Sequence, residues 1–145
     1  MLRQFNRMPL KRRPKKERIR VVFCGGHFAG WAALSAFVEP WNWCWQNCEV
    51  VAVVPDRKDI PSAKGSLWDM DESSWRIKMV PQLAKVNDLR VARLDLYPGT
   101  KFNRQFADLL RKTRADCFLS STFRGIFRQE SLDCVMGERG LCNPA

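Results

Sequence analysis

The stretch Arg18-Ile-Arg-Val-Val-Phe-Cys-Gly-Gly26 decides the fold of this chain. It has no polar position after Arg20 and runs directly into two glycines, which is typical of a buried strand that ends in a tight turn. Residues 28–38 then repeat apolar side chains at helical spacing, and Pro40 ends that helix. A second apolar run follows at 49–54. Two buried strands separated by one helix predict a right-handed βαβ unit with parallel strands.

The remainder of the chain continues this alternation of strands and helices. The sequence predicts a polar surface loop at 56–76, a short helix at 77–86 and a strand near an edge at 89–94. It then predicts a helix at 101–113, a strand at 115–121, a helix at 126–136 and the start of a fifth strand at 140–145. The expected fold class is therefore α/β: a Rossmann-like, three-layer fold with a mostly parallel sheet, incomplete at the C-terminus. In such folds ligands bind at the carboxyl ends of the strands.

The formal net charge of +10 is concentrated at the amino-terminal end. Residues 1–20 hold nine Lys or Arg and one acid, Glu17, so that +8 lies there and +2 on the rest. We therefore expect a basic flexible arm over 1–17 and an α/β domain over 18–145. The arm has three interpretations: a solvated tail, a mitochondrial presequence, or a segment that binds the phosphates of RNA. The basic residues are not followed by the apolar segment of a secretory signal.

Cysteine and histidine content limits the metal and redox chemistry. The chain has six cysteines and one histidine. Cys44 and Cys48 are four residues apart, but no second pair has the spacing of zinc ligands. We expect reduced thiols, no metal site and an intracellular location, mitochondrial or cytoplasmic. No run of about 18 apolar residues is present, so we expect no membrane-spanning helix.

Four segments together resemble a known family. They are Arg20-Val-Val-Phe-Cys-Gly-Gly-His-Phe-Ala29, Glu49-Val-Val-Ala-Val-Val-Pro-Asp-Arg57, Ala115-Asp-Cys-Phe-Leu-Ser-Ser-Thr-Phe-Arg-Gly-Ile-Phe127 and Gly140-Leu-Cys-Asn143. Their order and spacing are similar to the amino-terminal domain of the formyltransferases that use 10-formyltetrahydrofolate, and most similar to the methionyl-tRNA formyltransferases. The Trp-rich stretch 41–48 has no counterpart in that pattern. A dinucleotide site is not expected, because no Gly-x-Gly-x-x-Gly follows the first strand.

The resemblance implies a folate site in the loop after the strand at 115–121. In the family a Tyr-Gly pair followed by Ile-Leu-Pro helps to hold the pterin ring, and the matching residues here are Phe123, Arg124, Gly125 and Ile126. Phe123 keeps an aromatic ring and Ile126 an apolar wall. Arg124, however, stands where the family has a glycine that lets the backbone approach the ring. These residues are equally consistent with a simple turn from strand to helix.

The resemblance also implies a catalytic asparagine, which Asn143 matches. In the family this asparagine and a histidine two residues later stabilise the oxyanion that forms when an amine attacks the formyl carbon, and a later aspartate orients the histidine. Ala145 stands at the position of that histidine, and the sequence does not contain the later aspartate. His27, in the turn after the first strand, is expected to be an ordinary loop histidine. We therefore expect the chain alone to be inactive.

Two classes of function remain open. The chain is either the front part of a folate-dependent formyltransferase, or a non-catalytic formyltransferase-like binding or assembly protein that acts through its basic arm on RNA or a ribonucleoprotein. For the enzyme we expect methionyl-tRNA as acceptor, with a sugar nucleotide amine or a small ribonucleotide amine as alternatives. In either class residues 1–20 are the expected contact with tRNA or other RNA. A third interpretation is a single-stranded RNA binder that stacks bases on Trp41, Trp43 and Trp45.

Overall fold

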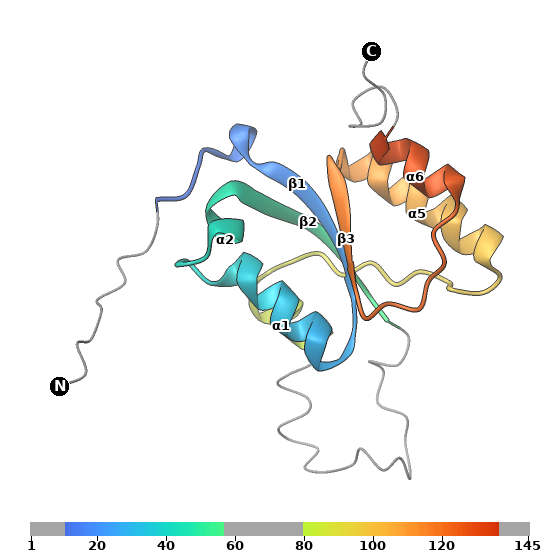
Figure 1. Ribbon diagram of the computed structural model, residues 1–145, viewed down its shortest axis with the longest axis horizontal. Helices are drawn as coiled ribbons and strands as arrows, with labels where there is room; N and C mark the ends of the chain where they lie inside the picture. Colours follow the sequence, from blue (N-terminus) through green and yellow to red (C-terminus); the bar gives the residue numbers. More distant parts are fainter. Residues whose placement is uncertain (1–10, 57–79, 137–145) are drawn as a thin grey trace, which may run out of the picture.

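Three parallel strands form the centre of the structure. The computed structural model describes residues 11–56 and 80–136. Its sheet has the order β2-β1-β3, with β1 (Ile19–Gly25) between β2 (Cys48–Pro55) and β3 (Cys117–Ser121) (Figure 1). Both pairings are parallel, and the carboxyl ends of the three strands lie together, with Gly25 paired to Pro55 on one side and Ser121 on the other. The three strands that the apolar runs predict are confirmed.

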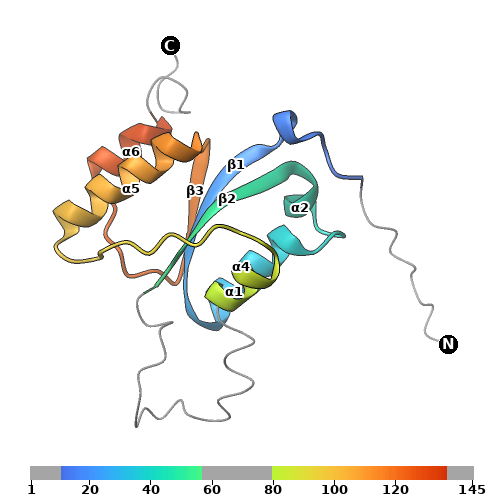
Figure 2. The same cartoon turned by 180° about the vertical axis from the view of Figure 1, so that it is seen from behind.

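Helices cover both faces of this sheet. α1 (His27–Val38) and α4 (Val80–Val86) lie on one face, and α5 (Gly99–Thr113) and α6 (Gln129–Met136) lie on the other (Figures 1 and 2). Side chains of a strand alternate between its two faces, so that neighbouring apolar residues enter different layers. Phe23 packs in the cluster that contains residues of α1 and α4, whereas Val22 packs in the cluster that contains residues of α5. The expected fold class, a three-layer Rossmann-like α/β fold, is confirmed.

The prediction of a strand at 89–94 is wrong. There the chain makes one isolated parallel bridge, Val91 to Val53. The Val53 N–H donates to the Arg90 carbonyl at 2.7 Å, and the Ala92 N–H donates to the Val53 carbonyl at 2.8 Å. After this bridge the chain must cross from the α4 face to the α5 face of the sheet (Figure 2). The alternating charged and apolar residues at 89–94 therefore belong to a segment that crosses between the two faces and pairs with the edge of the sheet at one residue, Val91.

The start of α6 differs from the sequence prediction, and one helix was not predicted. The last described helix, α6, begins at Gln129 rather than at 126, because residues 123–128 are held in a non-helical loop described below. The Trp-rich stretch contains a short helix that the sequence did not predict, α2 (Trp43–Asn47). Residues 57–76 of the loop predicted at 56–76, the predicted fifth strand at 140–145 and Asn143 lie outside the described residues.

The described part of the expected arm contacts the fold. The Arg13 N–H donates to the Gln46 carbonyl of α2 at 3.0 Å, and the Arg12 side chain contacts Trp45. A short 3-10 helix, η1 (Lys15–Glu17), then leads into β1. Residues 11–17 are thus attached to α2 and β2, whereas the domain boundary at residue 17 stays a prediction.

Within residues 11–56 and 80–136, five cysteines are free thiols and no cluster of three His, Cys, Asp or Glu side chains could hold a metal ion. None of the described helices has the length and apolar character needed to cross a bilayer.

Candidate functional site

Three turns meet at the carboxyl edge of the sheet and build one site. The Gly26 N–H donates to the Ser121 carbonyl at 3.2 Å, and the Asp56 N–H donates to the Gly25 carbonyl at 3.1 Å. These bonds tie the turn after β1 to the ends of β2 and β3. Gly25 permits the close approach, since an added Cβ would lie 2.8 Å from the Ser121 carbonyl oxygen. A side chain at this position would therefore push the strand ends apart.

Asp56 is the most unusual residue of this edge. Its side chain is 1% exposed, and neither carboxylate oxygen has a hydrogen-bond partner among the described residues. Two basic side chains lie near the same oxygen: His27 Nε2 is 3.8 Å from Oδ2, and Arg124 Nε is 3.9 Å from it. Both distances are longer than a hydrogen bond. A buried carboxylate left in this state is costly, and this cost makes Asp56 a candidate functional residue.

The turns around Asp56 also carry strained backbone. His27 begins α1 with φ 57° and Thr122 follows β3 with φ 52°. This left-handed region costs energy for residues other than glycine, and a β-branched threonine is rarely found there. Such strain is commonly kept at functional sites, where the surrounding structure imposes it. It places His27 beside Asp56 rather than in an unconstrained loop.

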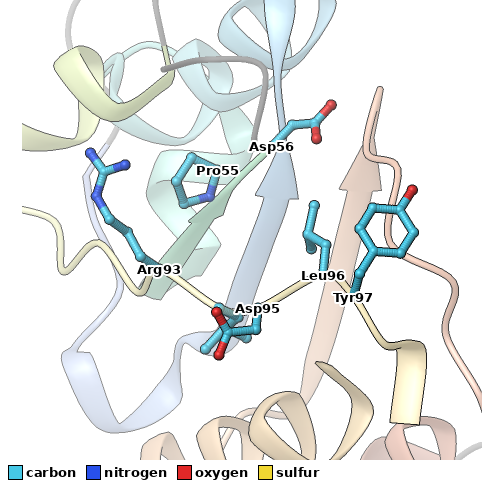
Figure 3. Close-up of a pocket in the computed structure, with 7 residues that line it drawn as sticks. Pro55, Asp56, Arg93, Asp95, Leu96 and Tyr97 are labelled. Carbon is cyan, nitrogen blue, oxygen red and sulfur yellow. The ribbon is translucent and has the colours of Figure 1, made fainter. Parts of the chain in front are cut away.

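An open pocket of about 350 Å³ lies beside this edge, between the end of β2 and the crossing segment. Its lining residues are Pro55, Asp56 and 93–97. In Figure 3 the carboxylate of Asp56 points away from Arg93 and Asp95, on the side where the ring of Tyr97 projects. The crossing segment is fixed to α5, since Asp95 lies 2.9 Å from Lys101 Nζ and its N–H donates to Gln105 Oε1.

The loop after β3 contains the four residues that the resemblance assigns to folate. The ring of Phe123 packs into the interior, 5.7 Å from Phe102 and stacked on Phe127 at 5.7 Å between ring centroids. Arg124 is half exposed and reaches toward Asp56. Gly125 is required because a Cβ would overlap the Phe123 ring. Ile126 is 72% exposed. The loop therefore presents Arg124 and Ile126 to the solvent, whereas Phe123 is partly buried against the core.

Asn103 of α5 holds this loop, a role that the sequence analysis missed. It is 1% exposed, and its Nδ2 donates to the Gly99 carbonyl at 2.7 Å and to the Ile126 carbonyl at 2.8 Å. Its Oδ1 accepts from the Arg128 N–H at 2.7 Å and from Ser131 Oγ at 2.6 Å. An asparagine within the buried stripe of a helix was the available signal, because such a group must be fully hydrogen-bonded. For Asp56 the signal was a carboxylate directly after a buried strand.

The geometry thus brings together His27, Asp56 and Arg124, of which the sequence analysis had assigned only Arg124 to a ligand site. Asn143 lies outside the described residues, and its assignment as the catalytic asparagine stays a prediction.

Comparison with known proteins identifies the fold. A scan against protein-family models and a search of curated proteins both find no match. Among solved structures, the chain matches phosphoribosylglycinamide formyltransferase from Bacillus halodurans with a TM-score of 0.55 and 19% sequence identity. The match covers 81% of this chain and 52% of that protein, so the chain spans about half the length of its structural neighbour. This chain therefore has the fold of a formyltransferase.

Proposed function

We propose that this chain is a domain of a folate-dependent formyltransferase, with 10-formyltetrahydrofolate as formyl donor and methionyl-tRNA as acceptor. The observation that carries the proposal is the buried Asp56 carboxylate at the carboxyl edge of a formyltransferase-like sheet. Ligands of open α/β sheets bind at this edge. The order of the four sequence segments supports the choice of donor and acceptor.

The donor supplies an activated formyl group, which is bound to its N10 atom. In the transfer, the acceptor nitrogen bonds to the formyl carbon, the bond from that carbon to N10 breaks, and one proton passes from the acceptor to N10. Because the Asp56 carboxylate is buried, we assign it to orienting the partly exposed side chains of His27 and Arg124, which face the ligands at this edge. Both side chains lie within 4 Å of Asp56.

The described loop fits a folate ring in part. Ile126 offers an exposed apolar surface, and Asn103 keeps the loop backbone in one conformation. Phe123 does not fit the role of a ring-stacking wall, because its own ring is packed against Phe102 and Phe127. Arg124 occupies the position of the family's glycine and faces Asp56 instead. In our proposal the donor therefore lies on Ile126 and the loop backbone rather than on Phe123.

We further propose that the chain alone binds the donor without turnover. Ala145 stands where the family has the histidine that acts with the asparagine matched by Asn143, and the single histidine, His27, lies instead at the start of α1. Removal of acid–base or oxyanion groups each typically costs about 10²–10⁴-fold in rate. A protein with this donor and acceptor works in the cytoplasm or the mitochondrion, where folate and tRNA meet.

A titration with 10-formyltetrahydrofolate, followed by tryptophan fluorescence, tests the proposal. We expect saturable binding that Ile126→Glu weakens about tenfold, equivalent to about 1.4 kcal/mol, because the new carboxylate must be desolvated against the ring. Val86→Glu is the matched control, since Val86 is also 72% exposed but lies on α4. Absence of saturable binding, or equal losses in both variants, would overturn the donor assignment. Formylation of methionyl-tRNA by the unmodified chain would contradict the proposed inactivity.

The second candidate is a non-catalytic binding or assembly protein. The observation that favours it is Arg124, whose guanidinium extends to the carboxylate in a place where the family keeps glycine. The same titration separates the candidates, because a protein of this second kind has no need to bind the donor.

A further inference from the structure

The basic segment at the amino-terminal end is docked beside the Trp-rich stretch. Arg12 Nε donates to the Trp45 carbonyl at 2.9 Å, and the Arg12 guanidinium carbon lies 4.9 Å from the centre of the Trp45 ring. The Arg13 N–H donates to the Gln46 carbonyl, and Arg18 Nε donates to the Arg13 carbonyl at 2.7 Å. The segment therefore lies in a fixed place on α2 and at the start of β2.

Docking leaves this region with surplus positive charge. Residues 11–20 contain seven Lys or Arg and one acid. The carboxylate of Glu49 forms ion pairs with two of these side chains, Lys15 at 3.5 Å and Arg20 at 3.7 Å. Within the part of the chain that the structure describes, the exposed side chains of Lys11, Arg13 and Lys16 contact no carboxylate. Burial and the nearby charge of Arg18 lower the pKa of Arg12, which agrees with an excess of cations.

Two tryptophans are exposed at the same place. Trp43 is 60% exposed and lies in the short helix α2 that Arg12 and Arg13 contact, and Trp41, two residues before this helix, is 49% exposed. Large aromatic rings are usually buried when they serve only packing. The one carboxylate on this turn, Glu39, accepts a hydrogen bond from Asn42 at 2.9 Å. Both exposed rings therefore belong to the segment 41–47, against which residues 12 and 13 of the basic segment are held.

We propose that Lys11, Arg13, Lys16, Trp41 and Trp43, named here the tryptophan-basic surface, bind single-stranded RNA. Exposed aromatic rings stack on the faces of unpaired bases while cations contact the phosphates, and this combination is the usual design of single-strand binders. A duplex hides its base faces from such rings. A membrane would require a longer amphipathic helix, whereas α2 has five residues and ends in Gln46 and Asn47.

This surface is distinct from the site around Asp56. It lies at the amino-terminal ends of β1 and β2, and Asp56 lies beyond their carboxyl ends (Figure 1). Seven residues of β1 separate the two, a distance of roughly 23 Å at about 3.3 Å per residue. RNA bound here is held away from the chemical site, so the proposal stands whether or not the chain transfers formyl groups.

Fluorescence anisotropy of the full chain with a labelled oligouridine of about ten nucleotides tests the proposal. We expect the double variant Trp41→Ala/Trp43→Ala to weaken binding by about tenfold or more, because stacking contributes about 1–3 kcal/mol per base. We expect Arg13→Gln/Lys16→Gln to reduce the slope of log affinity against log salt by about 1.4, since each lost phosphate contact removes about 0.7. Phe28→Ala and Lys112→Gln are the controls, because Phe28 is 46% exposed at the other edge and Lys112 is exposed on α5.

Each outcome of this experiment is informative. Undiminished binding by the tryptophan variant, in a protein with an unchanged circular dichroism spectrum, would overturn the stacking role. Equal affinity for an RNA duplex of the same length would show an electrostatic contact without strand selection. Tighter binding to vesicles of phosphatidylserine and phosphatidylcholine than to the oligouridine would assign the surface to a membrane instead. Weakening by the Phe28 control equal to that of the tryptophan variant would move the contact to the carboxyl edge.

Discussion

Asp56 is expected to lower the stability of the protein. Among the described residues its carboxylate is buried without hydrogen bonds, and the nearest basic side chains, His27 and Arg124, are both partly exposed and remain hydrated without it. Asp56→Asn should therefore raise the free energy of unfolding by about 1 kcal/mol, as is common when a functional group is removed from an unfavourable environment. Thermal unfolding should shift upward by about 2–4 °C.

Asp108→Asn is the control for this measurement. Asp108 pairs with Arg111 at 3.4 Å on the exposed face of α5, where such a pair contributes about 0–1 kcal/mol. A loss of stability in Asp56→Asn larger than that of the control would identify the Asp56 carboxylate as a structural ion pair and would remove the argument for a ligand.

Cys24 gives the protein a defined pH dependence. Complete burial in β1 raises the pKa of its thiol, and burial also raises the pKa of Cys48, Cys117 and Cys134. An unfolded chain releases its thiol protons above about pH 8.5, whereas the folded chain retains the proton of Cys24. The unfolded state then binds fewer protons, so stability is constant below that pH and falls as the pH rises above it.

Urea unfolding from neutral pH to about pH 9.5 measures this effect. Cys24→Ala should be less stable at neutral pH, because it leaves a small cavity, but its stability should fall less steeply with pH. Cys44→Ala is the control, since Cys44 is only half buried. Identical pH slopes for the unmodified chain and Cys24→Ala would show that the thiol of Cys24 titrates in the folded state.

At the scale of elements, Asn103 joins α5, the loop at 123–128 and α6. Its four hydrogen bonds reach Gly99, Ile126, Arg128 and Ser131. Asn103→Ala leaves buried partners unsatisfied and should lower the free energy of unfolding by about 3 kcal/mol. Hydrogen exchange at the Arg128 amide should become faster as well.

Asn87→Ala is the matched control. Asn87 also donates to the carbonyl four residues before it, at 2.9 Å, but at an exposed position at the end of α4. Its loss should change stability by less than about 0.5 kcal/mol. If both variants lose the same amount, the loop after β3 does not depend on Asn103.

The elements that could be predicted are those with regular periodicity. Apolar runs located β1, β2 and β3, and the stripe of Phe102, Phe106 and Leu110 located α5. The strand at 89–94 failed because alternation alone does not reveal that the chain must cross between faces. The environment of Asp56 could not be predicted, since its burial depends on three turns that are distant in sequence.

At the scale of the whole molecule, charge is divided between the two ends of the sheet. Sequence counting located the positive charge in residues 1–20 but could not reveal where it lies. The contacts of Arg12 and Arg13 with α2 attach the described part of this charge, residues 11–20, to the amino-terminal ends of the strands. The carboxyl edge has its own charged group around Asp56. The two ends are therefore suited to different ligands.

Two truncations separate the roles of the basic residues. Residues 1–10 hold two arginines, whereas 11–17 hold five Lys or Arg, so deletion of 1–10 should leave most of the affinity for single-stranded RNA. Deletion of 1–17 should abolish that affinity and expose the Trp45 ring, because Arg12 no longer covers it. The core of β1, β2 and α5 is untouched in both, and their circular dichroism spectra should agree.

Loss of RNA binding on deletion of 1–10 alone would show that the docked cations are insufficient. Full binding by the longer deletion would leave the tryptophans as the sole contact and would contradict the part assigned to Lys11, Arg13 and Lys16.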